Sequence, residues 1–133
     1  MVTRIHHINF VVHDLDEAEE RYRRMLGLSA GVREALPGRG VNTARFDLGG
    51  SWLVLVQPLG DEGEPARHLR ERGEGFFLLS FAVDDLETAM AEAEQRGAHF
   101  SAAGAREGIQ GWRIVDFDQR DTLGAILQLT EGA

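Results

Sequence analysis

The chain has 133 residues, 43% of them hydrophobic and 27% charged, a balance typical of one globular domain with a sizeable core. Its formal net charge of −8 disfavours binding to nucleic acid or to an anionic membrane, and the absence of cysteine excludes disulfides, thiolate metal ligands and a cysteine nucleophile. No apolar run reaches transmembrane length and no leader-like segment occurs, so we expect a cytoplasmic protein without a membrane partner.

The first elements in chain order are an apolar strand and an amphipathic helix. Residues 5–12 form the apolar run, and the helical pattern begins after Asp14 and ends at Gly27. Aspartate is a favourable N-cap, and glycine commonly ends a helix. The apolar positions of this pattern follow the spacing of a one-sided helix, so we expect the helix to pack on one face of a sheet.

The middle of the chain contains a predicted strand and a connection. A turn at Gly49-Gly50 precedes the apolar strand 52–56. Residues 58–65 are rich in proline and glycine, and residues 66–72 form a short charged helix that Gly73 closes. This stretch is typical of a linker that contains a helical turn.

The rest of the chain repeats the first pattern. The apolar run 76–83 leads into Asp85 and a helical stretch that ends at Gly97, and the strand 126–130 follows a turn at Gly124. Two similar copies indicate an internal duplication within one domain. We place module 1 at about 1–60, the linker at about 61–74 and module 2 at about 75–133.

Alternation along each strand sorts the side chains into two rows. One row is strongly apolar and is expected to face the helices, and the other row is partly polar. If the first row forms the core, the second lines the inside of a curved sheet, and His6 lies on the opposite row to His7. The predicted lining residues are His7, Asn9, Trp52, Val54, Leu78, Ser80 and Gln128.

Several short motifs, in this order and at these intervals, resemble the vicinal-oxygen-chelate superfamily, and within it the methylmalonyl-CoA epimerases. They include His7-Ile8, Asp14-Leu15, the segment 25–28, the segment 57–60 and the segment 81–86. The resemblance implies an α+β, glyoxalase-like fold in which two βαβββ modules form a curved mixed sheet, a cup with the helices outside. It also implies a divalent metal held by one residue from each of four strands.

Carried over to this sequence, those metal positions fall on His7, Val54, Leu78 and Gln128. Two of the four are aliphatic and donate no lone pair, and no carboxylate is present among them. We therefore predict no bound metal and no cofactor, and no metal-stabilised enediolate chemistry.

For the other candidate residues the sequence leaves more than one role open. Arg45 and Arg113 lie in matching regions of the two modules and either clamp an anionic ligand or pair with nearby carboxylates, here Asp47 or Asp116. Trp52 either stacks on a planar ligand or seals the rim of the cup or a subunit contact. The catalytic residue, if there is one, is His7, and the alternative for His7 is a buried histidine that Gln128 or Asn9 satisfies.

Replacing metal ligands by aliphatic residues is expected to give a mostly apolar pocket. The leading hypothesis is a metal-free protein, similar to bleomycin-resistance proteins of the superfamily, that sequesters a hydrophobic, aromatic small molecule, as in antibiotic resistance. The alternative is a metal-independent isomerase, lyase or epimerase that acts on a small carbonyl or acyl-CoA substrate. A third possibility is a structural or regulatory domain without a ligand. The superfamily resemblance also favours a homodimer.

Overall fold

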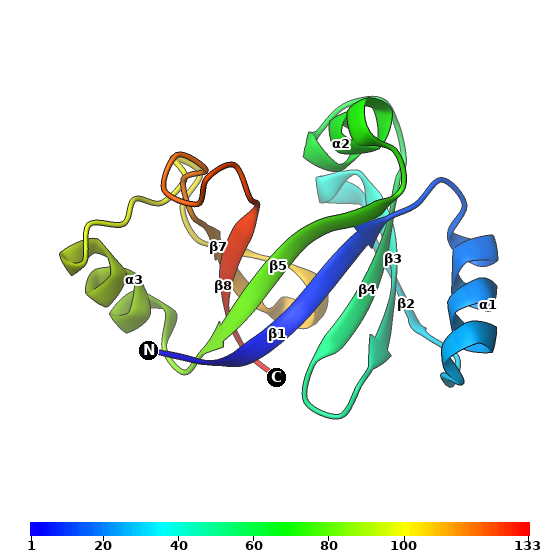
Figure 1. The fold of residues 1–133 in the computed structure, drawn as a ribbon, viewed down its shortest axis with the longest axis horizontal. Helices are drawn as coiled ribbons and strands as arrows, with labels where there is room; N and C mark the ends of the chain where they lie inside the picture. The colour runs from blue at the N-terminus through cyan, green and yellow to red at the C-terminus, as the bar shows by residue number, and fades with distance from the viewer. The chain divides into compact units, whose positions relative to one another are not determined.

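The computed structural model describes residues 1–133 and has an α+β architecture with eight strands, three α-helices and two short 3-10 helices (Figure 1). The elements follow the predicted order, with strand, helix and three strands occurring twice and α2 between the two copies. The predicted glyoxalase-like pair of βαβββ modules is thereby confirmed. The elements are β1 (Val2–Val11), α1 (Leu15–Leu26), β2 (Val32–Leu36), η1 (Pro37–Arg39), β3 (Val41–Asp47), β4 (Trp52–Pro58), α2 (Glu64–Arg72), β5 (Gly75–Val83), α3 (Leu86–Gln95), β6 (Arg106–Glu107), η2 (Ile109–Gly111), β7 (Arg113–Asp116) and β8 (Leu127–Glu131).

The chain divides into two compact units, and strand β1 contributes to both. Unit 1 consists of Met1–His7 and Leu78–Ala133, and unit 2 consists of Ile8–Phe77. The first seven residues therefore belong with the second repeat, although they precede the first.

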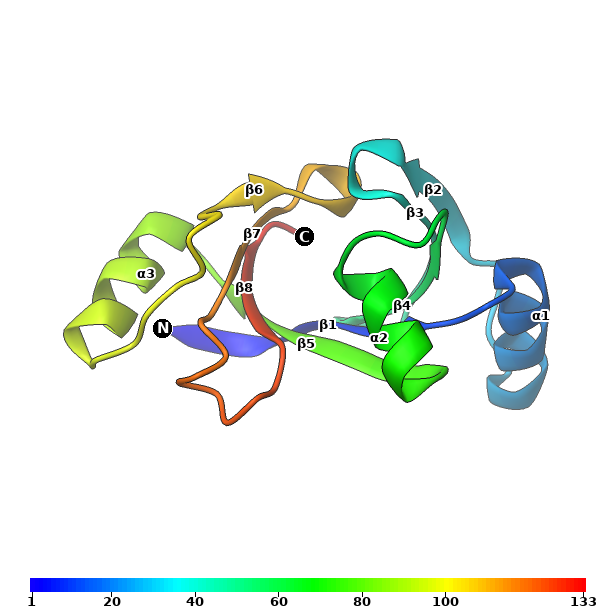
Figure 2. The same ribbon diagram turned by 90° about the horizontal axis from the view of Figure 1, so that it is seen from above.

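Unit 2 contains the strand order β2-β3-β4-β1, with β2, β3 and β4 antiparallel. Helix α1 packs beside these strands, as Figures 1 and 2 show. The core under α1 comes from the apolar row predicted from strand alternation, which explains why the other row is free to carry polar side chains. The buried members of this core are Val12, Leu15, Ala44, Phe46, Leu53 and Leu55.

Unit 1 contains the strand order β1-β5-β8-β7-β6, in which β5 and β8 run parallel, whereas β7 pairs antiparallel with both β8 and β6. Helix α3 contacts β8, and the core lies between them. This core again uses the predicted row of β5 and β8. Its buried members are Val83, Leu86, Ala89, Val115 and Leu129.

The helix ends follow the sequence signals closely. Asp14 caps α1 by accepting a hydrogen bond from the Glu17 amide, and Gly27 ends it with a left-handed backbone at φ 66°. Asp85 caps α3 in the same way, through the amide of Thr88. Helix α2 begins at Glu64, two residues earlier than expected.

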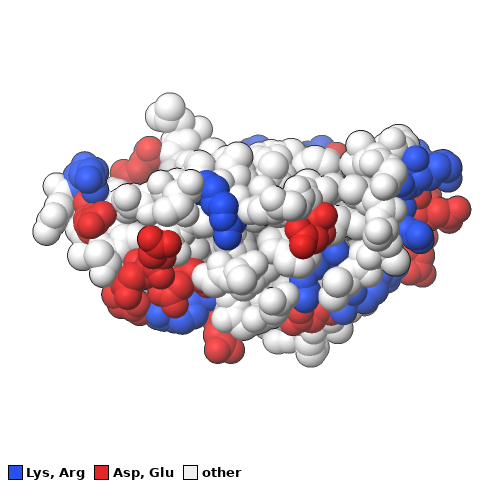
Figure 3. Space-filling view, turned by 90° about the horizontal axis from the view of Figure 1, so that it is seen from below, with Lys and Arg blue, Asp and Glu red and all other residues white.

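None of the helices combines the length and the hydropathy that a membrane-spanning helix needs. On the face shown in Figure 3, arginine side chains are interspersed with aspartate and glutamate side chains.

Candidate functional site

Four of the predicted lining residues lie in unit 1. His7 ends the part of β1 in this unit, Leu78 and Ser80 belong to β5, and Gln128 belongs to β8. Ser80 and Gln128 are register partners, and Leu78 lies two residues from Ser80, on the same face of β5. All four are at least nine-tenths buried.

His7 is the centre of an aromatic cluster. Its ring stacks on Trp112 with centroids 5.1 Å apart and an interplanar angle of 20°. The ring of His6 meets that of Trp112 edge-on at 4.5 Å, and the Nδ1 atoms of His6 and His7 lie 2.9 Å apart. The expectation that His6 lies on the opposite row is therefore wrong, because both imidazoles turn toward the same indole.

Burial determines the ionisation of His7. The side chain is 2% exposed, and its pKa is lowered from 6.5 to about 3, mainly by desolvation and also by the neighbouring His6, while the Gln128 side chain acts in the opposite direction. Burial also lowers the pKa of His6, while its hydrogen bond to the Gly132 carbonyl acts in the opposite direction. Both imidazoles are therefore neutral at physiological pH.

The amide of Gln128 is held in one orientation. Its Nε2 donates to Asp116 Oδ1 at 2.8 Å, and Asp116 also pairs with Arg106 at 2.8 Å. Gln128 Oε1 is buried and accepts no hydrogen bond. Because a buried acceptor without a donor is costly, this oxygen is a candidate for contact with a ligand that donates a hydrogen bond.

Ser80 is less available than predicted. Its hydroxyl lies 2.5 Å from that of Thr130, and neither residue is exposed to solvent. The hydroxyl pair therefore ties β5 to β8 inside unit 1.

The sequence patterns identify neither Trp112 nor the role of the Asp116 carboxylate as a partner of Gln128. Trp112 is 2% exposed and contacts both histidines. The available signal was that the chain contains only two tryptophans, but only Trp52 lies in an obvious strand pattern. Asp116 was considered as a partner for Arg113, whereas it binds Arg106 and Gln128.

The other predicted residues of the polar row lie in unit 2. Arg45 and Val54 are register partners on β3 and β4, and Val54 is completely buried. The Arg45 guanidinium donates to Glu34 Oε1 at 2.9 Å and lies 5.4 Å from the centre of a Trp52 ring. Arg45 thus pairs with a carboxylate, although with Glu34 in place of Asp47. Asn9, also in this unit, has a buried Oδ1 that accepts no hydrogen bond.

Arg113 lies on the other face of β7 from the residues around Gln128. It binds the Glu87 carboxylate of α3 through both terminal nitrogens, and Glu131 is 3.8 Å away. Asp116, three residues along β7, points to the face of Gln128. The structure therefore does not bring Arg113 into the group around His7.

The donor set does not fit the divalent metal that the family resemblance implies. Val54 and Leu78 offer no ligand atom, and His7 uses Nδ1 in its contact with His6. One imidazole nitrogen and one amide oxygen, on His7 and Gln128, then remain from the four carried-over positions. Such a set falls short of the donors that a catalytic divalent ion requires.

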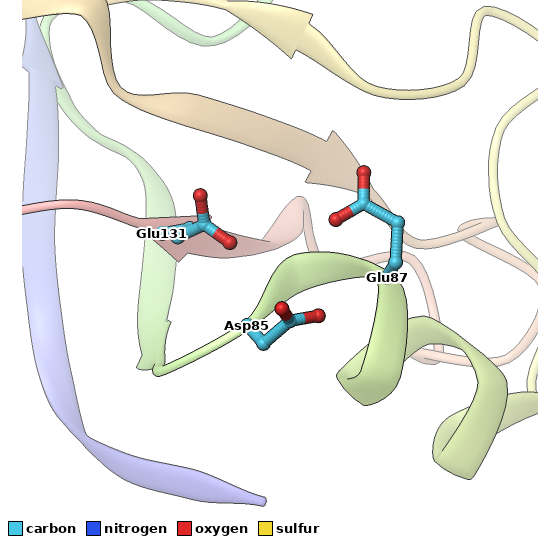
Figure 4. Close-up of side chains that lie close together, drawn as sticks. All are labelled: Asp85, Glu87 and Glu131. Atoms are coloured by element: carbon cyan, nitrogen blue, oxygen red, sulfur yellow. The ribbon is translucent and has the colours of Figure 1, made fainter.

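An acidic group gathers at the start of α3 and the end of β8, as Figure 4 shows. The ligand atoms of Asp85, Glu87 and Glu131 lie within 4.8 Å of one another. Each carboxylate has a structural partner, since Asp85 caps Thr88, Glu131 accepts from the Leu86 amide and Glu87 binds Arg113. We interpret this group as the cap of α3.

Comparisons with known proteins agree with the motif resemblance. A family model described as the Glyoxalase/Bleomycin resistance protein/Dioxygenase superfamily matches residues 6–115. The ethylmalonyl-CoA/methylmalonyl-CoA epimerase of Cereibacter sphaeroides is 27% identical over 134 residues, covering 98% of this chain and 99% of the relative.

Solved structures give the same result. The methylmalonyl-CoA epimerase of Mycobacterium tuberculosis has a TM-score of 0.92 at 29% identity, covering 99% of this chain and 89% of the other. A variant of Streptomyces coelicolor methylmalonyl-CoA epimerase, in complex with 2-nitronate-propionyl-CoA, has a TM-score of 0.90 at 28% identity, covering 100% and 99%.

Proposed function

This chain belongs to the glyoxalase/bleomycin resistance protein/dioxygenase superfamily, and from that premise we propose that it is a metal-independent isomerase or epimerase for a small carbonyl or acyl-CoA substrate. The observation that carries the proposal is the neutral, buried imidazole of His7 beside the unpaired Gln128 Oε1. Several relatives are named as epimerases of methylmalonyl-CoA or ethylmalonyl-CoA, which supports an acyl thioester as the substrate class. This reading replaces sequestration as the leading hypothesis.

The proposed reaction is exchange of the proton next to a thioester carbonyl. His7 Nε2 accepts the α-proton, and the C–H electron pair forms the enolate of the thioester. Water delivers a proton to the opposite face of the α-carbon, and the imidazolium releases the abstracted proton to solvent, which inverts the centre and completes the exchange. Because His7 is only 2% exposed, the reaction requires a substrate whose acyl end is compact.

The low pKa of His7 has two opposite effects on this chemistry. It keeps the imidazole unprotonated at neutral pH, but a base is most effective when its pKa lies near the working pH. An enolate that forms next to His7 places a negative charge beside the ring, and an opposite charge raises the pKa of a histidine. The base is thus expected to strengthen as the reaction proceeds.

The test uses methylmalonyl-CoA and ethylmalonyl-CoA in deuterated buffer, with the α-carbon followed by proton NMR and mass spectrometry. Incorporation of one deuterium per molecule, at a rate proportional to protein concentration, supports the proposal. Binding of a thioester without any exchange contradicts it.

The second candidate function is sequestration of a hydrophobic, aromatic small molecule, as in antibiotic resistance. The aliphatic side chains of Val54 and Leu78 favour it, because they replace donors by apolar surface. A panel of planar natural products, tested by thermal shift and recovered for mass analysis, distinguishes the two. A bound compound that is returned unchanged, together with inert thioesters, supports sequestration.

We also infer a homodimer and a cytoplasmic location, both from the family resemblance and the composition. Light scattering coupled to gel filtration measures the first. A mass equal to that of one chain, at micromolar concentration, contradicts the dimer.

A further inference from the structure

The contact between His6 and His7 holds one hydrogen between two nitrogens of the same kind. Their Nδ1 atoms are 2.9 Å apart, and the rings are nearly perpendicular, at 83°. An Nδ1···Nδ1 contact this short requires one nitrogen to carry hydrogen and the other to offer its lone pair. The question is which residue donates.

The contact made by the other ring nitrogen of His6 identifies the donor. His6 Nε2 lies 3.1 Å from the carbonyl oxygen of Gly132, and a carbonyl oxygen only accepts. His6 Nε2 therefore carries a hydrogen. A neutral imidazole has one N–H, so His6 Nδ1 is the acceptor and His7 Nδ1 is the donor.

We propose that His6 is a positioning residue that selects the tautomer of His7, holding hydrogen on Nδ1 and leaving the Nε2 lone pair free for a ligand or substrate proton. The inference deepens the proposed function and rests on it for its chemical purpose. The tautomer itself exists in the free protein and is measurable without any substrate.

The surroundings make the alternative tautomer a real competitor. Gln128 Oε1 is buried without a donor, and the Gln128 amide is close enough to His7 to act on its pKa. A hydrogen on His7 Nε2 would bond to that oxygen only after a small side-chain movement, because neither ring nitrogen of His7 lies at hydrogen-bond geometry to it here. His6 opposes this state, because its own hydrogen is committed to Gly132 and its Nδ1 needs a donor.

Trp112 packs against both imidazole rings and restricts their rotation. It stacks on His7 and meets His6 edge-on, so neither imidazole is free to rotate without losing an aromatic contact. The tautomer is thus set by His6 and the ring orientation by Trp112.

The test is nitrogen-15 NMR of histidine-labelled protein, which distinguishes protonated from bare ring nitrogens. In the unaltered protein we expect His7 to carry hydrogen on Nδ1. In His6→Phe, which keeps an aromatic ring beside Trp112 but removes the acceptor, we expect the hydrogen to shift to Nε2. His6→Asn offers an amide oxygen as acceptor and should restore the original tautomer.

The exposed His13, changed to phenylalanine, is the matched control and should leave the His7 resonances in place. An Nε2–H tautomer of His7 in the unaltered protein, or the same tautomer in the unaltered protein and in His6→Phe, overturns the inference.

Activity is a separate readout. If α-proton exchange occurs, His6→Phe should slow it about 100-fold or more, and His6→Asn should recover much of it. An Nδ1–H tautomer in a protein that exchanges no thioester proton leaves the tautomer assignment standing and contradicts the proposed function alone.

Discussion

His6 and His7 meet through their Nδ1 atoms at 2.9 Å, although the two residues are consecutive in strand β1. Consecutive side chains of a strand ordinarily point to opposite faces. Both rings also pack on Trp112, so the three side chains form one buried aromatic cluster. This cluster keeps His7 neutral and orients it, and it is the basis of the proposed metal-independent proton transfer.

The first prediction concerns metal content. The purified protein should contain far less than one zinc, nickel, cobalt or manganese ion per chain, because Val54 and Leu78 provide no ligand atoms. A chelator should leave the melting temperature unchanged, since a bound metal would otherwise stabilise the folded state. Elemental analysis checks the content, and about one ion per chain would show that other residues supply ligands.

The second prediction is a pH dependence of stability caused by His7. Its pKa is lowered from 6.5 to about 3 in the folded protein. Between these pH values the unfolded chain binds a proton at His7 that the folded chain does not, so the free energy of unfolding falls as the pH is lowered from 6.5. The contribution is on the order of a few kcal/mol across this range.

Urea unfolding from pH 7 to pH 4 measures this effect. His7→Asn removes the titrating group and should show a shallower loss of stability, whatever its stability at pH 7. The exposed His13, changed to asparagine, is the control. Equal pH profiles for His7→Asn and the unaltered protein would contradict the prediction.

The order of elements and the two cores followed from the sequence because both depend on local patterns. Asp14 and Asp85 are helix caps by their chemistry, and alternation assigned Leu55 and Leu129 to the core rows. The contact of His6 with His7 breaks that alternation, so pattern reasoning placed His6 wrongly. Trp112 lies in a short irregular stretch between η2 and β7, where no periodicity shows which way a side chain points.

The sequence pattern also did not predict which carboxylates pair with Arg45 and Arg113. Arg45 binds Glu34 of β2, because β2 pairs with β3, and Arg113 binds Glu87 of α3. Both partners are distant in sequence, and only the strand order and helix packing bring them close.

The third prediction concerns the buried hydroxyl pair of Ser80 and Thr130. Ser80→Ala leaves the Thr130 hydroxyl buried without its partner and should lower the free energy of unfolding by about 1–3 kcal/mol. Thr130→Val should have a similar effect. The double variant should be more stable than the sum of the two losses predicts, because no unpaired hydroxyl remains. Strictly additive losses would show that the two hydroxyls are not coupled.

The fourth prediction compares the duplicated helix caps. Asp14→Ala should lower the free energy of unfolding by about 1 kcal/mol, because the Glu17 amide loses its acceptor. Asp85→Ala should cost less, since Asp85 lies close to Glu87 and Glu131 and its removal relieves repulsion between carboxylates. Asparagine at either position keeps the cap and serves as the control. A larger loss for Asp85→Ala would mean that the acidic group stabilises α3 in another way.

The most direct test of the central claim is α-proton exchange of methylmalonyl-CoA in deuterated buffer by protein that has been treated with a chelator. Exchange should continue at an unchanged rate after chelation and after addition of divalent metal. His7→Asn should slow exchange about 100-fold or more, whereas His13→Asn should not. Exchange that disappears with the chelator and returns with metal, or exchange that is equally fast in His7→Asn, would contradict metal-independent proton transfer by His7.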